Sequence, residues 1–353
     1  MKYFYKMNIV ILFITLMFLG SQNIYSQNLD ETLSNLSSDA AKQYVGPVVN
    51  AFGSNLNSGW VAKVPSTKLG LTVELKFIGV GTVLSNSDQT FATSGTFHYT
   101  DAQAQQILQA SGINPGDANY ASIKNEILSK EWAVNMSGPT INGSKDEYLN
   151  VEFPGATIQG QQVGKYNTTI EDVKGYLNKL SIFPSAAAQL TLGTVAGTQV
   201  SFRYFPKVDV KDLGKFEWFG FGFIHNPAYW LKNPLPVDIG IGYFYQKLKV
   251  GDIFESKTTQ VGIYASKSFG FIFAFIPYVG LTTETSKTTV TYDYSYDTPA
   301  GSSTAKINFD LEGKNTVGFT LGVAVKLAVA NLNIDYKLAK VNTFSAGLSF
   351  GLL

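Results

Sequence analysis

Cysteine is absent from this sequence of 353 residues, and histidine occurs only twice. The absence of cysteine excludes disulfides, thiolate metal sites, cysteine nucleophiles and a lipidated N-terminal cysteine. Charged residues form only 15% of the chain, whereas a soluble domain carries about 25%. The formal net charge is +1, and the 27 lysines and arginines are scattered along the chain. This distribution indicates no nucleic-acid partner.

Long apolar runs are also scarce. The main one lies at the N-terminus, where Lys2 and Lys6 precede an apolar stretch at 9–19 and a polar segment that ends at Ser26. This order is typical of a secretory signal peptide, and the stretch is shorter than the about 20 residues that span a bilayer. We therefore expect residues 1–26 to be a signal peptide that is removed on export, with no transmembrane helix after it.

The sequence is rich instead in aromatic residues, at 14%, and in glycine, with 33 residues, while its mean hydropathy is +0.04. From about residue 186 onward, apolar residues alternate with polar residues and glycine, as in strands with two different faces. The clearest examples are residues 237–246, 317–327, 330–338 and 344–352. A soluble sandwich would bury the apolar faces against each other, whereas an outer-membrane barrel would turn them toward lipid.

Three features of these strands favour the barrel. Many of them have the length of a tilted transmembrane strand, about 10 residues. Connections such as residues 327–330 and 340–342 are short, and aromatic residues such as Tyr243 and Tyr245 lie toward strand ends, where interfacial girdles form. The sequence therefore predicts an all-β fold, an antiparallel transmembrane β-barrel with an even number of strands, about 10–14.

The direction of the chain orders these strands. If the last strand ends at the periplasm, earlier strands alternate back to residue 186, and a first strand at 68–83 leaves from the periplasm. Residues 271–327 then form a hairpin much longer than the membrane requires, with its tip at 297–302 outside the cell. Residues 225–235 fall on the periplasmic side.

Two regions break the strand pattern. Residues 30–52 carry apolar side chains at helical spacing, and Pro47 is expected to shorten or kink this helix. The segment 27–60 that contains it is interpreted either as a periplasmic helix or as a plug inside the barrel. Residues 84–185 form a mixed α/β insertion within the barrel domain, 61–353, and are expected to be a loop domain, a lid or a constriction.

Three helices and two weaker strands are predicted within the insertion. The helices span about 102–110, 117–127 and 168–177, and the strands span 91–99 and 148–163. Thr100 with Gln103 forms a capping-box pattern before the first helix, Asp117 is expected to cap the second, and Thr168 with Glu171 marks the third.

Catalytic and metal-binding constellations are lacking. His98 has no second histidine or cysteine near it in the sequence, so we expect no metal site, and no motif points to a cofactor. His225, with Tyr229 and Trp230, stands beside several prolines and is interpreted as an interfacial anchor of the barrel rim. We expect the protein not to be an enzyme.

Charged and aromatic residues occur at positions that we assign to the inner face of the barrel. The candidate lumen-lining residues are Glu74, Lys76, Arg203, Glu217, Phe219, Phe221, Asp238, Phe244, Lys326 and Asp335, and Gln199, Phe223 and Lys337 follow the same pattern. They are interpreted either as a polar network that stiffens a small barrel or as a constriction that contacts a ligand. A wall of mixed aromatic and polar character suits an amphipathic ligand better than ions, because an open porin lumen is strongly polar.

The C-terminal half also carries a family resemblance. Residues 218–222, His225, the pair Trp230-Leu231, residues 236–239 and the pair Gly242-Tyr243 resemble a family of uncharacterised Gram-negative outer-membrane β-barrels. That family is itself reminiscent of long-chain fatty-acid transporter barrels, which have an N-terminal plug and a hydrophobic ligand path. The resemblance covers roughly residues 186–353 and carries over no ligand-binding residue.

Together, the pattern and the resemblance predict a protein of the cell outer membrane that takes up a hydrophobic or amphipathic small molecule by passive diffusion. The alternative is a structural or surface-interaction barrel, like an adhesin, that transports nothing. The expected partners are outer-membrane lipid, a hydrophobic small-molecule ligand and the barrel assembly machinery.

Overall fold

We analysed a computed structural model that describes residues 30–67, 72–210, 214–232, 235–298 and 301–352. The predicted signal peptide lies outside these ranges. Among the helices of the described ranges, none is long and apolar enough to cross a membrane.

Ten strands form a closed antiparallel barrel. In chain order they are β1 (Thr72–Val83), β8 (Ile182–Val195), β9 (Thr198–Val210), β10 (Gly214–His225), β11 (Asp238–Val250), β12 (Phe254–Ser266), β14 (Phe273–Thr298), β16 (Val317–Leu327), β17 (Ala330–Leu338) and β18 (Thr343–Leu352). Pairing of β1 with β18 and of β12 with β14 closes the ring. The prediction of an even-stranded antiparallel barrel is therefore confirmed, at the lower end of the predicted strand number.

The outer face of the barrel is apolar. Large hydrophobic side chains at alternate positions, such as Phe77, Ile263 and Leu321, are exposed, while their neighbours in sequence point inward. A continuous exposed apolar surface around a closed barrel is what a lipid environment requires, because water would not tolerate so large an apolar area.

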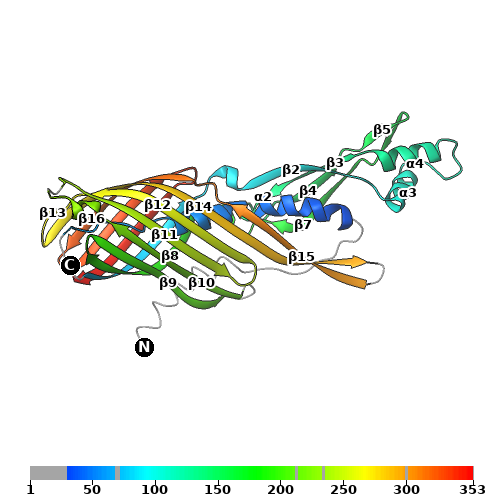
Figure 1. Cartoon of the computed structure of the whole chain (residues 1–353). Coiled ribbons are helices and arrows are strands. Elements are labelled where there is room, and N and C mark those ends of the chain that lie inside the picture. The colour runs from blue at the N-terminus through cyan, green and yellow to red at the C-terminus, as the bar shows by residue number, and fades with distance from the viewer. Residues whose placement is uncertain (1–29, 68–71, 211–213, 233–234, 299–300, 353) are drawn as a thin grey trace.

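The two ends of the barrel differ (Figure 1). The C-terminal rim carries the end of β18, the two-residue turn at 196–197 and the turn at 328–329, together with η2 (Pro227–Trp230) and β13 (Phe269–Gly270). The opposite end, here called the insertion rim, carries residues 84–181, which lie between β1 and β8, and a long hairpin. The long hairpin and the insertion therefore extend from the same end of the barrel.

The long hairpin is formed by the second half of β14, which has 26 residues, and β15 (Gly301–Glu312). The first half of β14 pairs with β12 and β16 inside the barrel, and its second half pairs with β15 beyond it. The predicted single strand that leads from the hairpin tip to residue 327 is divided at 313–316. The division lets β15 pair only with β14 while β16 enters the barrel wall.

The insertion domain, residues 84–181, contains a separate four-stranded sheet. Its strands are β2 (Thr90–Phe97), β3 (Trp132–Pro139), β4 (Tyr148–Phe153) and β7 (Tyr166–Lys174), joined by η1 (Asn86–Asp88), α3 (Asp101–Ala110), α4 (Tyr120–Ser129) and the small hairpin of β5 (Ala156–Ile158) and β6 (Gln161–Val163). Side chains of α3, α4 and this sheet share one apolar core, which includes Leu108, Ile123, Trp132 and Val151.

The helix predictions for the insertion are partly wrong. The capping box of Thr100 and Gln103 is confirmed at the start of α3. The second helix starts at Tyr120, because the Asp117 carboxylate accepts the Asn114 backbone N–H at 2.8 Å instead of capping a helix. The third predicted helix is absent, since this segment is strand β7 and pairs with β4. Its β-branched residues favour a strand over the local capping signal.

The N-terminal helix α2 (Asp30–Leu56) runs from the insertion domain into the barrel (Figure 1). It continues through Pro47 and extends beyond the predicted end at residue 52, because Asn55 finds hydrogen-bond partners inside the barrel. Its amide donates to the Phe183 carbonyl at 3.0 Å and its carbonyl accepts from the Thr82 hydroxyl at 2.6 Å. The plug interpretation is confirmed for residues 48–60, which lie in the lumen. The earlier part of the helix packs against the insertion domain and the long hairpin instead.

Candidate functional site

The candidate site is the lumen with the segment that fills it, here called the plug (residues 48–66). The inner wall of the barrel is polar and contains buried amides, hydroxyls and charged groups. After α2 ends at Leu56, the plug continues without regular structure toward the C-terminal rim. An irregular backbone cannot satisfy its own carbonyl groups, so the wall must supply donors.

Wall side chains donate hydrogen bonds to the plug main chain along its length. Arg203 Nη1 reaches the Ser58 carbonyl at 2.9 Å, and Lys76 Nζ reaches the Gly59 carbonyl at 3.0 Å. The Asn57 carbonyl accepts two hydrogen bonds, from Gln260 Nε2 at 2.8 Å and from Lys337 Nζ at 3.2 Å. The Trp60 carbonyl accepts from Gln189 Nε2 at 3.3 Å. The Pro65 carbonyl accepts from Asn226 Nδ2 at 2.8 Å. The donors come from strands all around the barrel, so the plug is held at its centre.

An aromatic stack fixes the middle of the plug. The Arg203 guanidinium lies 3.9 Å from the centroid of the Trp60 ring, and Trp60 stacks on Phe244 at 4.8 Å. Phe244 has room for this because Gly222, its cross-strand neighbour on β10, lacks a side chain. A Cβ atom at Gly222 would come within 2.1 Å of the Phe244 ring. The inward glycines of β10 thus make space for the ring on which the plug rests.

Replacing Gly222 with valine is therefore expected to lower the free energy of unfolding by about 1–3 kcal/mol, because Phe244 must leave its stacked position. Gly79 is the matched control, since its Cβ would meet only a backbone oxygen at 3.9 Å, and Gly79→Val should change stability little. Denaturant unfolding in micelles measures both variants. Equal losses for the two glycines would contradict the proposed role of the space at Gly222.

A buried ion pair lies beside the plug. Lys337 Nζ is 2.7 Å from Glu284 Oε2, and their side chains are 2% and 0% exposed. On the same wall, the Tyr278 hydroxyl donates to Asp335 at 2.8 Å. Because Lys337 also donates to the Asn57 carbonyl, one ammonium group joins β14, β17 and the plug.

Apolar packing closes the lumen toward the insertion rim. Phe52 and Leu56 of α2 pack against Ile78, Phe183 and Trp218 of the wall. Polar contacts add to the seal, since the Ser54 hydroxyl contacts the Thr343 hydroxyl. At this level the helix α2 occupies the lumen and packs against the wall.

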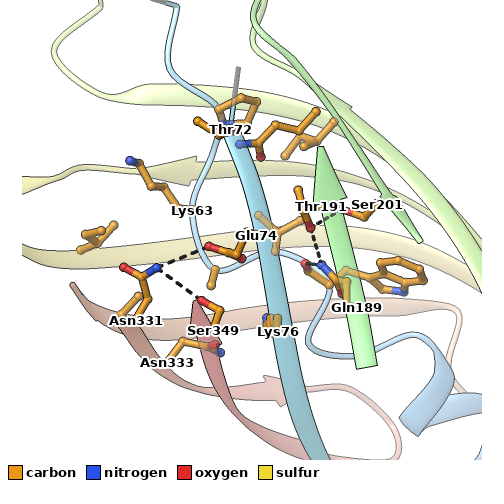
Figure 2. A pocket seen from close by; sticks show the side chains of 18 of the residues that line it. Lys63, Thr72, Glu74, Lys76, Gln189, Thr191, Ser201, Asn331, Asn333 and Ser349 are labelled. Carbon is orange, nitrogen blue, oxygen red and sulfur yellow. Dashed lines mark hydrogen bonds between the residues drawn. The ribbon is translucent and has the colours of Figure 1, made fainter. Parts of the chain in front are cut away.

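A cavity of about 270 Å³ remains near the C-terminal rim, between residues 60–66 of the plug and the wall (Figure 2). Its polar side comes from β1, β8, β9, β17 and β18, and its apolar side comes from Ile224, Phe244, Ile276 and Ala324. Lys63 of the plug and Glu74 of β1 both line it. The cavity is the space that the plug leaves unfilled.

The structure places several predicted lumen residues together. Lys76, Arg203, Phe244 and Asp335 are buried inside the barrel around the plug, and Glu74 lines the cavity. Two others lie at the C-terminal rim. Asp238 accepts from Asn226 Nδ2 at 3.3 Å, and Lys326 Nζ lies 5.8 Å from the Phe271 ring centroid.

The prediction that Phe219, Phe221 and Glu217 line the lumen is wrong. Phe219 and Phe221 lie on the outer face of β10 and are 48% and 37% exposed, and Phe223 follows them. Glu217 is on the same outer face, where it pairs with Lys207 at 2.8 Å. The physical reason is the plug, which requires the glycines of β10 on the inside and thereby turns the aromatic residues toward lipid.

The predicted rim anchors form one cluster at the C-terminal rim. Trp230 Nε1 donates to His225 Nε2 at 3.1 Å, and His225 Nδ1 lies 2.9 Å from the Thr198 hydroxyl. The Tyr229 and Trp230 rings meet edge to face with centroids 4.9 Å apart. An exposed indole beside a tyrosine at the end of the strands has the position of an interfacial girdle residue.

Several residues of the site are absent from the sequence-based prediction. They are Asn57, Ser58, Gly59 and Trp60 of the plug and Gln189, Gln260 and Glu284 of the wall. Glu284 could have been recognised from the sequence, because it is the only acidic residue in a stretch of threonines with one serine and one lysine at 282–288. The plug residues had none, since most of their contacts use main-chain atoms. No group of acidic residues or histidines in the described ranges is placed to hold a metal ion.

Comparisons with known proteins give one family and several distant structural likenesses. The transport unit of the autotransporter AIDA-I from Escherichia coli is 9% identical, with 87% of this chain and 97% of that chain covered and a TM-score of 0.28. OmpT of Vibrio cholerae, an outer membrane protein, is 10% identical over 81% and 99% of the two chains, with a TM-score of 0.21. A Rh. blastica porin mutant is 8% identical over 81% and 100%, with a TM-score of 0.15.

These TM-scores are too low to carry an argument, so the strand pairing itself establishes the barrel. The three similar structures are outer-membrane barrels, and the likeness is not to fatty-acid transporters specifically. Among the curated proteins, no sequence matches this chain. A family model described as a family of unknown function, DUF6588, matches residues 1–352, and the chain belongs to this family.

Proposed function

We propose that this protein is an outer-membrane barrel that presents the insertion domain and the β14–β15 hairpin at the cell surface for interaction with a partner, while the plug keeps the lumen closed. The observation that supports this proposal most directly is the lumen itself, which is filled by α2 and its extension. In this arrangement the C-terminal rim faces the periplasm. The protein would depend on outer-membrane lipid and on the barrel assembly machinery, as other barrels of that membrane do.

The helix α2 supports a surface role because it braces the external parts against the barrel. Ala40 lies in the core of the insertion domain, and Tyr44 packs against that core. The Tyr44 hydroxyl donates to the Lys174 carbonyl at 2.9 Å. On the same helix, Val45 and Val49 pack with Val290 and Phe309 of the hairpin. A surface domain that binds a partner must keep its position on the barrel, and the contacts of α2 with both the insertion domain and the hairpin hold it there.

Uptake of a small molecule is the second candidate, and the polar plug supports it. Polar contacts with the wall exchange for contacts with water at a small net cost, which favours a movable plug. The outward position of Phe219 and Phe221 removes the argument for a hydrophobic path. A polar or amphipathic solute suits this lumen better.

Excision of the surface parts tests the first candidate. We expect a variant lacking residues 290–310, or one with residues 86–180 replaced by a short glycine-serine linker, to lose retention of cells on immobilised glycans and matrix proteins, with membrane permeability unchanged. An epitope tag in the exposed loop at 114–118 should be labelled on intact cells, whereas a tag at 328–329 should not. Labelling of only the second tag would reverse the orientation, and retention that survives both excisions would exclude the surface role.

A further inference from the structure

Three charged side chains, Lys63, Glu74 and Lys76, line the cavity near the C-terminal rim. Lys76 donates to the Gly59 carbonyl at 3.0 Å, whereas the opposite charges of Lys63 and Glu74 do not pair with each other. Figure 2 shows Lys63 and Glu74 lining the same space, and no ion pair within 4.0 Å joins them. Within the part of the chain that the structure describes, the Lys63 ammonium has no hydrogen-bond or ion-pair partner. The Glu74 carboxylate has one weak contact, with Asn331 Nδ2 at 3.4 Å. Both groups are half-buried, so each has capacity for a further hydrogen bond or ion pair within the cavity.

The rest of the polar side offers neutral hydrogen-bonding groups. The amides of Gln199 and Asn333 and the hydroxyls of Thr72, Ser201 and Ser349 line the cavity. The Gln199 amide has no partner among the described residues, so it adds a free donor and a free acceptor. Such a wall can bind a small polar group that donates hydrogen bonds or one that accepts them.

The opposite side of the cavity is apolar. Ile224, Ile276 and Ala324 face the polar wall across the cavity. A ligand that meets both sides needs a charged end of each sign and a hydrocarbon part. The volume of about 270 Å³ is below the usual range for ligand sites, about 300–1,000 Å³, so the ligand must be small.

We infer that this cavity binds a small zwitterion with an apolar side chain, of the class of free α-amino acids. Its carboxylate contacts the Lys63 ammonium, its ammonium contacts the Glu74 carboxylate, and its side chain packs against Ile224 and Ile276. The ligand enters from the C-terminal rim, because α2 closes the lumen on the other side. The inference is independent of what the insertion domain binds.

Equilibrium binding of leucine, methionine and phenylalanine to the purified full chain in micelles tests this site. We expect at least one of them to bind, and N-acetyl-leucine and leucine methyl ester, which each lack one charge, to bind about tenfold or more weakly than leucine. These blocked compounds test the contacts in the unaltered protein. No binding of any free amino acid up to about 10 mM, or equal binding of leucine and both blocked compounds, would overturn the inference.

Single substitutions then assign each charge. Glu74→Gln should weaken leucine binding and abolish the preference for leucine over N-acetyl-leucine. Lys63→Met should abolish the preference for leucine over its methyl ester. The matched controls Lys249→Met and Glu255→Gln alter charges on the outer face and should leave binding unchanged. A folded variant that retains the preference it is expected to lose would show that its side chain does not contact the ligand, which also overturns the inference.

Discussion

Replacing Lys337 with methionine is expected to lower the free energy of unfolding by about 3–5 kcal/mol, because it leaves the Glu284 carboxylate buried without its cation. The pair is separated by 2.7 Å and is almost wholly buried. The same substitution removes the bond from Lys337 to the Asn57 carbonyl, so the plug loses one of its wall contacts. Denaturant unfolding in micelles, followed by tryptophan fluorescence, measures the loss.

The matched control for this prediction lies on the outer face. Lys287 and Asp310 are also 2.7 Å apart, but their side chains are 60% and 46% exposed. Lys287→Met should therefore cost less than about 1 kcal/mol. The double variant K337M/E284M should recover most of the stability lost by Lys337→Met, because no charge then remains buried. A loss for Lys337→Met no larger than that for Lys287→Met would show that the buried pair is not needed to hold the wall.

The barrel could be predicted from the sequence because lipid imposes one rule on every strand. Outward positions must be apolar along the whole span, and the alternation in β16, β17 and β18 follows that rule without exception at positions such as Leu321, Ile334 and Leu348. Short connections between several consecutive strands, such as 196–197, 251–253 and 328–329, then indicate the strand order. Because the same alternation repeats in all ten strands, the barrel can be recognised even where one strand departs from the pattern.

The inner face of β10 was harder to predict because glycine and phenylalanine alternate there. Either set can face a lumen, since glycine is compatible with lipid or with close packing. The choice depends on Phe244 and Trp60, which need the space over Gly222. These residues are distant in sequence, so only the assembled barrel decides which face of β10 points inward.

The location of the N-terminal segment could not be predicted for a related reason. A helix with apolar residues at helical spacing can pack against a barrel interior or against another apolar surface. The identity of Phe52 and Leu56 does not show which of the two they contact. The residues that hold the plug donate to its carbonyl groups, which every residue possesses. Arg203, the only arginine of the chain, indicated a special inward position but not what it would bind.

Removing the plug is expected to have the largest effect on permeability. Deletion of residues 27–66, with residues 1–26 joined directly to the segment that precedes β1, should convert a closed barrel into one that conducts ions steadily, with a conductance about tenfold or more above the full chain. A barrel of about eight strands is filled by its own side chains, and wider barrels hold water. This barrel has ten strands, and its inner face includes small residues such as Gly220, Ser201 and Ser345. Single-channel recording in planar bilayers measures the change.

A cysteine pair distinguishes a fixed plug from a movable one, and the absence of native cysteine makes the experiment clean. The hydroxyls of Ser54 and Thr343 are in contact, so S54C/T343C should form a disulfide that ties α2 to β18. If the plug moves to admit a solute, transient openings of the full chain should disappear in the oxidised variant and return on reduction. If the full chain never opens in either state, the surface role alone remains. A deletion variant that folds but stays silent would instead show that wall side chains, such as Arg203, Lys337 and Phe244, fill the vacated space and close the lumen.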